Sequence, residues 1–410
     1  MKVKNIDIIT SPDDANRLRL VGEVVYDNKD LKPELYWFEV DKKYKDDINT
    51  TGNPWLICLL PLAVTIGEPI QICNSIDSKL LENAKQLMQI WKCWYPDLHI
   101  IPIEAKVVNY TGNVENKKTA AFFSGGVDSF FTLLFHNDPT LNNSIHIDDL
   151  ISVFGFDIPL KNKEAFSMMK ENFQKVASEL GKELIDVATN LRKTHFNKSG
   201  WGKLSHGCAL ASIAHLLGNR LSKVLIASTG GYTGLIPWGS HPLTDPLLSG
   251  SDLTIIHDGA AFNRLQKTEF ISKYDLARKY LHVCYSIGTD KNCSQCVKCY
   301  RTMMMLDVLD EFKHFETFDK NKYSIAHISK FYNQVSWDYK YMNMVRSLAV
   351  IKKRIDLIKA IDSSFKHSKY LDIFLLYARK IEKWLKYKRF LWRYAGTIER
   401  WLLKGSIYKT

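Results

Sequence analysis

A six-residue loop, Ser124-Gly125-Gly126-Val127-Asp128-Ser129, carries residue types that suit phosphate binding. Adjacent glycines let the backbone turn sharply and bring its N–H groups close to an anion, because no Cβ stands in the way. The apolar segment 120–123 precedes the loop and the helix-like segment 130–135 follows it. The start of that helix would present unpaired N–H groups to the same anion. The pattern predicts a phosphate site, and a Gly-rich strand-to-helix turn without a ligand is the structural alternative.

The side chains of the loop indicate a nucleotide with its metal ion. Ser124 and Ser129 can donate hydroxyl hydrogen bonds to phosphate oxygens, whereas the Asp128 carboxylate suits a Mg²⁺ ion that bridges phosphates. The loop lacks the Gly-Lys-Ser/Thr ending of a Walker A motif and the Gly-x-Gly-x-x-Gly of a dinucleotide site. A phosphate loop of another class is therefore expected.

Half of the eight cysteines, Cys284, Cys293, Cys296 and Cys299, are clustered with the spacing Cys-x8-Cys-x2-Cys-x2-Cys. Four thiolates are the ligands of closed, structural zinc sites. An iron–sulfur cluster also uses four cysteines, so the spacing leaves the metal open. Accidental clustering or two disulfides is the alternative. The N-terminus has no export-signal pattern, which favours a metal over disulfides and predicts a cytoplasmic protein.

Short apolar segments alternate with helical patterns in the middle of the chain, as a parallel α/β sheet requires. The expected strands are 120–123, 151–156, 184–187 and 224–227, and the expected helices between them include 166–180 and 209–217. Such sheets bind ligands beyond the carboxyl ends of their strands. Phosphate chemistry is therefore expected just after Phe123, Phe156 and Ala227.

Other polar or Gly-rich residues are weaker candidates. Gly230 lies in a loop that could close over a nucleotide, or that is an ordinary turn. His206, at an expected helix start, could contact phosphate or be a structural histidine. Asp245 could orient a substrate or a second metal ion, or cap a turn. Lys267 is favoured as a catalytic residue, because a single cation would stabilise charge that develops on pyrophosphate.

The length and composition fit a globular chain of two or three units. The chain has 410 residues, of which 46% are apolar and 24% charged, and this excludes an acidic disordered protein. We expect an α+β N-terminal domain at 1–115, with a strand at 35–40 and a helix at 80–91. Its apolar run at 55–66 is too short to span a bilayer, which takes ~20 residues, and is expected to be a buried helix or strand pair. A strand at 99–108 would close this domain.

The excess positive charge lies in an expected helical tail, 316–410. Residues 340–410 hold 18 Lys and Arg and five Asp and Glu, a net +13, so the formal +12 of the whole chain leaves −1 for residues 1–339. The tail shows amphipathic spacing at 345–358 and interleaves bases with Trp384, Tyr387, Trp392 and Tyr394. It could bind RNA or an anionic membrane, or pack onto the body or onto a partner subunit in a homodimer.

The segment 119–315 resembles a known superfamily. Ser-Gly-Gly-x-Asp-Ser after a first strand is similar to the PP-loop of the N-type ATP pyrophosphatases, which have an adenine nucleotide alpha hydrolase-like fold. Within this superfamily, the four-Cys spacing and the segment Arg264-Leu265-Gln266-Lys267-Thr268-Glu269 are similar to 7-cyano-7-deazaguanine synthase. The resemblance implies that ATP is cleaved between its α- and β-phosphates, that the substrate is adenylated, and that a nucleophile then displaces AMP.

The resemblance also implies roles for the residues already singled out. Ser124, Gly125, Gly126, Val127 and Ser129 would cradle pyrophosphate, Asp128 would reach Mg²⁺, and the four cysteines would hold structural zinc. The chain departs from the family after the second strand, where Phe154-Gly155-Phe156 replaces Tyr-Gly-Gln, and at Ser205-His206, which replaces Arg-Asn. The substrate pocket is therefore expected to differ.

These features predict an AMP-forming ligase that uses ATP, Mg²⁺ and Zn²⁺. The enzyme would adenylate a carboxylate or amide substrate, such as a small carboxylate or a deazapurine-like molecule, and couple it to ammonia or an amine, as in queuosine-like biosynthesis. The first alternative is an RNA-modifying enzyme of the same superfamily, such as a tRNA-thiolating enzyme, with the basic tail as its RNA anchor. The second is a catalytically inactive nucleotide-binding module of an assembly.

Overall fold

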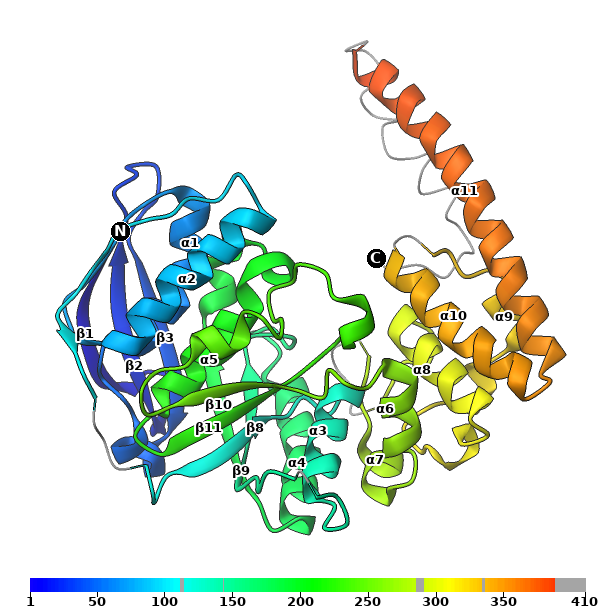
Figure 1. The fold of residues 1–410 in the computed structure, drawn as a ribbon, viewed down its shortest axis with the longest axis horizontal. Helices are drawn as coiled ribbons and strands as arrows, with labels where there is room; N and C mark the ends of the chain where they lie inside the picture. The colour runs from blue at the N-terminus through cyan, green and yellow to red at the C-terminus, as the bar shows by residue number, and fades with distance from the viewer. Residues whose placement is uncertain (111–113, 143, 285–290, 334–335, 388–410) are drawn as a thin grey trace. The chain divides into compact units, whose positions relative to one another are not determined.

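The computed structural model describes residues 1–110, 114–142, 144–284, 291–333 and 336–387 (Figure 1). By their contacts these residues form two compact units, Met1–Asn263 and Arg264–Thr410. The expected boundaries near 115 and 315 stay a prediction. None of the helices within the described ranges has both the length and the apolar character that a membrane crossing demands.

The first unit is built on a ten-stranded sheet with the order β12-β11-β8-β9-β10-β3-β2-β1-β4-β6. Its parallel strands are β8 (Lys118–Phe122), β9 (Asp149–Phe154), β10 (Glu183–Thr189), β11 (Leu221–Ala227) and β12 (Thr254–Asp258). The predicted α/β class with a largely parallel sheet is confirmed. In chain order these five strands follow the doubly wound arrangement, in which the strand order reverses between β8 and β11.

Helices cover both faces of the parallel strands. Helix α3 (Val127–Asn137) connects β8 to β9, and α4 (Lys163–Glu179) connects β9 to β10. Helix α5 (His206–Leu216) then connects β10 to β11, on the other side of β8. Right-handed crossovers place α3 and α4 on one face and α5 on the other. The expected helices at 166–180 and 209–217 are therefore confirmed as α4 and α5.

The N-terminal segment extends the same sheet. It contributes β1 (Lys2–Ser11), β2 (Asp14–Val25) and β3 (Glu34–Asp41), which pair antiparallel, followed by the short β4 (Ile70–Ile72) and β6 (Ile103–Glu104). Strand β3 pairs antiparallel with β10 and so joins the two parts of the sheet. The strand at 35–40 was expected, whereas β1, β2 and β12 were not. The expected long strand at 99–108 is wrong, because only β6 and β7 (Val107–Val108) form there.

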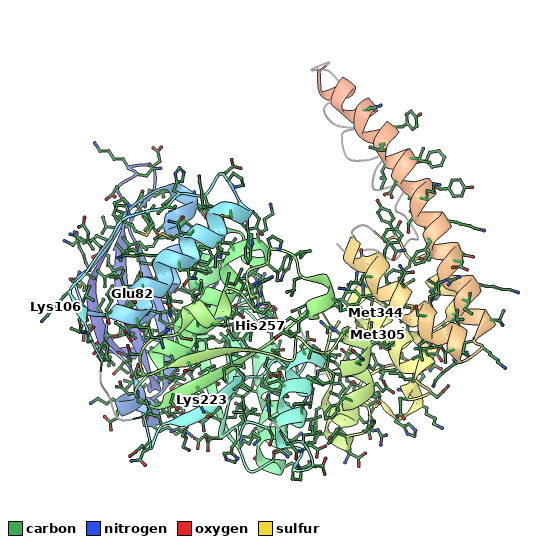
Figure 2. The ribbon with its side chains drawn as sticks, in the orientation of Figure 1. Glu82, Lys106, Lys223, His257, Met305 and Met344 are labelled. Atoms are coloured by element: carbon green, nitrogen blue, oxygen red, sulfur yellow. The ribbon has the colours of Figure 1, made fainter. Side chains whose placement is uncertain are left out.

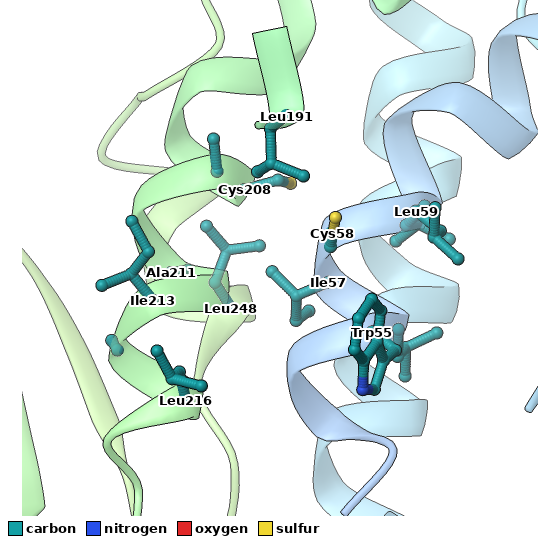
Figure 3. Close-up of a cluster of buried hydrophobic side chains, with 14 of the residues drawn as sticks. Trp55, Ile57, Cys58, Leu59, Leu191, Cys208, Ala211, Ile213, Leu216 and Leu248 are labelled. Carbon is teal, nitrogen blue, oxygen red and sulfur yellow. The ribbon is translucent and has the colours of Figure 1, made fainter. Parts of the chain in front are cut away.

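Helix α1 (Asn53–Ile66) is the centre of the apolar core. Its side chains are apolar on every face, and a helix of this kind must be buried on all sides. Residues 53–64 are indeed buried. Of the two structures expected for this segment, a buried helix or a strand pair, the helix is therefore correct. Figure 3 shows Cys58 of α1 facing α5, which carries Cys208, and both cysteines are free and buried. Helix α2 (Ser78–Trp94) confirms the helix expected at 80–91.

A buried group of charges lies where β2, β3 and β10 meet. Arg17 of β2 donates hydrogen bonds to Glu39 of β3 at 2.7 Å and to Asp186 of β10 at 2.6 Å. Arg19 donates a second bond to Glu39 at 2.6 Å. Burial raises the pKa of Asp186, but Arg17 and Lys170 outweigh this effect and hold the pKa below its usual value. The carboxylate is therefore ionised and paired within the sheet.

The second unit is helical. It contains α6 (Arg264–Ile271), α7 (Asp275–Tyr280), α8 (Val297–Val308), α9 (Ile325–Ile328), α10 (Ser336–Ile351) and α11 (Ile355–Tyr387). A single amphipathic helix across 345–358 is wrong, because α10 and α11 are separated at Lys353, which has a φ of 56°. Arg354 bonds Asp307 of α8 at this break. The side chains of Trp384 and Tyr387, and the whole of Trp392 and Tyr394, lie outside the described residues.

We predict that Arg17→Met lowers the free energy of unfolding by about 3–5 kcal/mol, because it leaves the buried Glu39 and Asp186 carboxylates without their shared cation. Lys43→Met is the matched control, since it removes an ion pair to Glu183 whose side chains are 58% and 38% exposed. This control should cost at most about 1 kcal/mol. Urea unfolding of both variants measures the difference, and equal losses would contradict the assigned role of Arg17.

Candidate functional site

The predicted phosphate loop connects β8 to α3. Gly125 has a φ of 72°, in the left-handed region that favours glycine, and Gly126 is the N-cap residue of α3. No side chain caps this helix start. The first N–H groups of a helix have no partner within the helix, so those of Val127, Asp128 and Ser129 point out of its N-terminus toward the loop. The backbone therefore has the arrangement that the sequence predicted for anion binding.

Hydrogen bonds within the loop fix its two serines. The Ser124 N–H donates to Ser129 Oγ at 3.3 Å, and Ser129 Oγ donates to the Gly126 carbonyl at 3.1 Å. Ser129 is buried and Ser124 is exposed, while Asp128 is half-buried in the first turn of α3. The buried Phe123 ring, before the loop, packs edge-on against Phe130 of α3, with ring centroids 5.0 Å apart. The loop is thus held at both ends by packing and hydrogen bonds.

The loop lies at the reversal point of the sheet. Strand β8 is flanked by β9 and β11, and the chain leaves β11 through the Thr229-Gly230-Gly231 segment. The Tyr232 N–H, just after these glycines, donates to the Ala260 carbonyl beyond β12 at 2.8 Å. Since parallel strands end at the same edge, Gly230 lies at the edge that carries the phosphate loop. Its contact with a nucleotide stays a prediction.

An aromatic cluster follows the carboxyl ends of β9 and β10. Phe156 and Trp201 pack edge-on with ring centroids 4.9 Å apart, and His206 lies between the rings of Trp201 and Trp238 at 6.0 Å and 6.3 Å. The Arg192 guanidinium lies over the Trp201 ring, 4.6 Å from its centroid. Trp201, His206 and Trp238 are partly exposed. Together they form an aromatic surface with one adjacent cation.

His206 begins α5, as the sequence analysis expected, and a π-helical turn at Trp201–Ser205 precedes it. Its Nδ1 lies 3.1 Å from the Trp201 carbonyl, which fixes this nitrogen as the donor. Burial lowers the pKa of His206 more than the nearby Asp245 raises it. The imidazole is therefore neutral at pH 7 and can accept a hydrogen bond at Nε2, which argues against a cationic role toward phosphate.

Asp258, the last residue of β12, ties this strand to α3. Thr132 Oγ1 donates to the carboxylate at 2.6 Å, and His136 Nε2 lies 2.9 Å from it. His136 Nδ1 accepts the Ile145 N–H at 2.9 Å, so the proton is on Nε2 and is donated to Asp258. The helix that begins at the phosphate loop is therefore anchored to the edge strand of the sheet.

Lys267 lies in α6 of the second unit. Its side chain is among the most deeply buried in the chain, with 1% of the residue exposed. The loop residues Ser124–Ser129 belong to the first unit and Lys267 to the second. A role for Lys267 toward pyrophosphate therefore stays a prediction.

The four clustered cysteines converge in the second unit, where Cys296 is the N-cap residue of α8. Their sulfur atoms all lie within 4.8 Å of one another. The Cys284–Cys296 and Cys293–Cys299 sulfur pairs are both 3.8 Å apart. A tetrahedral ion with Zn–S bonds of about 2.3 Å would place its sulfurs about 3.8 Å apart. The donor set therefore fits a metal such as zinc, and disulfides are not formed among these residues.

Backbone groups support the same sulfurs. The N–H groups of Gln295 and Cys296 lie 3.5 Å and 3.3 Å from Cys293 Sγ, and the Cys293 N–H lies 3.4 Å from Cys284 Sγ. Hydrogen bonding to Cys296 raises the pKa of the Cys284 thiol to about 11. Thiols packed this closely resist ionisation without a cation, so a metal ion would supply the charge that four thiolates need.

Three further residues that the structure places at this edge were not predicted from the sequence: Arg192, Trp201 and His257. The β-branched run Thr254-Ile255-Ile256 before His257 was the available signal, since it indicates a fifth strand whose carboxyl end carries polar residues. Comparison of the chain with protein-family models, curated proteins and solved structures gives no match.

We predict that the undenatured protein binds about one zinc ion per chain and that Cys293→Ser abolishes this stoichiometry. Cys93→Ser is the control, since Cys93 is a free, exposed cysteine outside the cluster. Metal analysis by mass spectrometry measures the content, and iron with visible absorbance would instead identify an iron–sulfur cluster. Protein purified without either metal would contradict the site.

Proposed function

We propose that this protein is an AMP-forming ligase of the PP-loop type, which activates a carboxylate with ATP and couples it to ammonia or an amine. The observation that carries the proposal is the placement of the Gly125-Gly126 turn at the uncapped start of α3, where the strand order reverses between β8 and β11. Doubly wound sheets bind nucleotides at this point. The Ser-Gly-Gly-x-Asp-Ser sequence specifies which nucleotide chemistry is proposed.

The loop residues would act on the β- and γ-phosphates of ATP. The backbone N–H groups from Gly125 to Ser129 would bind phosphate oxygens, and the Ser124 hydroxyl, which is exposed, would add a further donor. Asp128 is the carboxylate nearest to these groups in the sequence, so it would hold the Mg²⁺ ion that accompanies the phosphates. These donors favour pyrophosphate as the leaving group, because they stabilise the negative charge that it gains.

The aromatic cluster supports a planar, anionic substrate. Trp201 and Trp238 offer ring faces for stacking, and Arg192 offers a cation that is already held over Trp201 at 4.6 Å. A heteroaromatic carboxylate, deazapurine-like in shape, suits this combination. The metal held by the four cysteines would have a structural role, because a site closed by four thiolates has no open position for substrate.

The described part of the basic tail does not support RNA modification as strongly as the Gly-rich loop supports the ligase proposal. An RNA-modifying reaction would use the same nucleotide loop, and the aromatic residues that suggested RNA binding at 384–394 lie outside the described side chains. An inactive nucleotide-binding module would not require the Asp128 carboxylate. Both alternatives are separated from the proposal by the products formed from ATP.

We predict that the purified protein converts α-labelled ATP to AMP and pyrophosphate when it is given Mg²⁺, ammonium and a heteroaromatic carboxylate such as 7-deazaguanine-7-carboxylate. Asp128→Ala should reduce AMP formation by about 10²–10³-fold, because the phosphates lose their metal ligand. Asp97→Ala, at an exposed position, is the control and should be unchanged. Formation of ADP, or full activity of the Asp128 variant, would contradict the mechanism, and AMP formation that depends on added RNA would favour the RNA-modifying alternative.

A further inference from the structure

A buried carboxylate and a histidine are paired at the carboxyl end of β12. Asp245 Oδ2 lies 2.7 Å from His257 Nδ1, and the side chains of Asp245 and His257 are 0% and 5% exposed. Figure 2 labels His257 within the first unit. Ser240 Oγ donates to the same carboxylate at 2.6 Å, and the His241 N–H donates to Asp245 Oδ1 at 3.0 Å. Asp245 is thus held by three donors, and it fixes the orientation of the imidazole.

The arrangement is not that of an activated serine. Ser240 Oγ lies 3.4 Å from Nδ1, the nitrogen that faces Asp245, so the hydroxyl is on the carboxylate side of the ring. In a nucleophilic triad the serine instead contacts the opposite nitrogen. The short contact to Asp245 makes Nδ1 the proton donor, which leaves the Nε2 lone pair as an acceptor. Within the described residues, Nε2 of His257 makes no hydrogen bond. The pair therefore has the form of an oriented base.

The strand register places this base close to the phosphate loop. His257 pairs with Ile226 of β11, and Leu225, one residue earlier, pairs with Ala121 of β8. His257 is therefore level with Phe122, the last residue of β8, and two strand spacings of about 4.8 Å separate them. Its neighbour Asp258 points to the opposite face of the sheet, where it bonds Thr132 of α3. His257 thus lies on the α5 face, where the aromatic cluster begins.

The histidines next to the Asp245–His257 pair are neutral, and a glycine packs against the Asp245 carboxylate. Gly207, in the first turn of α5, approaches so closely that a Cβ there would lie 3.1 Å from Asp245 Oδ1. Burial lowers the pKa values of both neighbouring histidines, His206 and His241. No Lys or Arg bonds Asp245, whose partners in the described chain are Ser240, His241 and His257. Among the side chains that bond Asp245 in the described chain, His257 is the titratable one.

We infer that His257, positioned by Asp245, is the general base that takes the proton from the nitrogen nucleophile in the coupling step. This inference rests on the proposed function. The nucleophile nitrogen forms a bond to the acyl carbon of the acyl adenylate, the bond from that carbon to the AMP oxygen breaks, and AMP leaves with the electron pair. The proton that the nitrogen loses moves to Nε2 of His257 and then to water. Activation of the carboxylate by ATP transfers no such proton and does not need this base.

The two half-reactions separate this role from a structural one. Exchange of labelled pyrophosphate into ATP, measured with 7-deazaguanine-7-carboxylate, reports activation, and formation of the amide from ammonium reports coupling. His257→Gln should keep exchange near the wild-type rate and slow coupling by about 10²–10⁴-fold. Hydroxylamine, which attacks acyl adenylates without help from a base, should restore product formation in this variant. His146→Gln, with its side chain 84% exposed, is the control and should change neither reaction.

Asp245→Asn tests the positioning residue with the same two assays. Amide formation should be reduced, whereas pyrophosphate exchange should be retained. Thermal melting of each variant identifies a loss of folding. Coupling by His257→Gln at the wild-type rate would overturn the inference while leaving the proposed function intact. Equal losses of exchange and coupling in a folded variant, without rescue by hydroxylamine, would also overturn it. Absence of exchange in the wild-type protein would overturn the proposed function and the inference together.

Discussion

The antiparallel join between β3 and β10 is the constraint on which the first unit depends. Among the described strands, this pairing joins the N-terminal meander to the parallel strands, in a register that pairs Glu39 with Ala188 and Phe38 with Thr189. A one-residue shift of this register would move the buried side chains of β3 to the opposite face of the sheet. Arg17 adds a second constraint, since it must reach Glu39 and Asp186 at once, and both carboxylates are buried. Apolar burial and electrostatic pairing therefore favour the same alignment.

This alignment determines what the other edge of the sheet can do. Residues 1–110 add strands beyond β10 and leave β8, β11 and β12 at the far side, where the strand order reverses. The Gly-rich loop, the loop after β11 and the Asp245–His257 pair all follow from that topology. The two faces of β12 are used differently: Asp258 is bonded to α3, and His257 faces α5. The proposed phosphate binding and the proposed proton transfer would thus occur at the ends of β8 and β12, with β11 between them.

Local patterns predicted those elements whose environment is encoded nearby. Strand β8, the Gly125 turn and α3 follow each other within about twenty residues, and the four cysteines lie close together, so the strand–turn–helix segment and the cysteine cluster could both be predicted from the sequence. Strand β2 could not, because Arg17 and Arg19 interrupt its apolar pattern, and the Glu39 carboxylate that pairs with both of them lies on another strand. The break between α10 and α11 likewise depends on Asp307, which is distant in sequence from Arg354. The pairing of Asp245 with His257 also requires the folded sheet.

The bonds from Thr132 and His136 to Asp258 have a mechanical consequence. Helix α3 carries the phosphate loop at one end, and its middle and last turns are fixed to the residue that follows His257. A helix is stiff along its axis, so a displacement at its N-terminus is transmitted to β12 rather than absorbed. The Gly-rich loop and the His257 imidazole are therefore connected through one helix and one strand end, and a displacement of α3 would reach both.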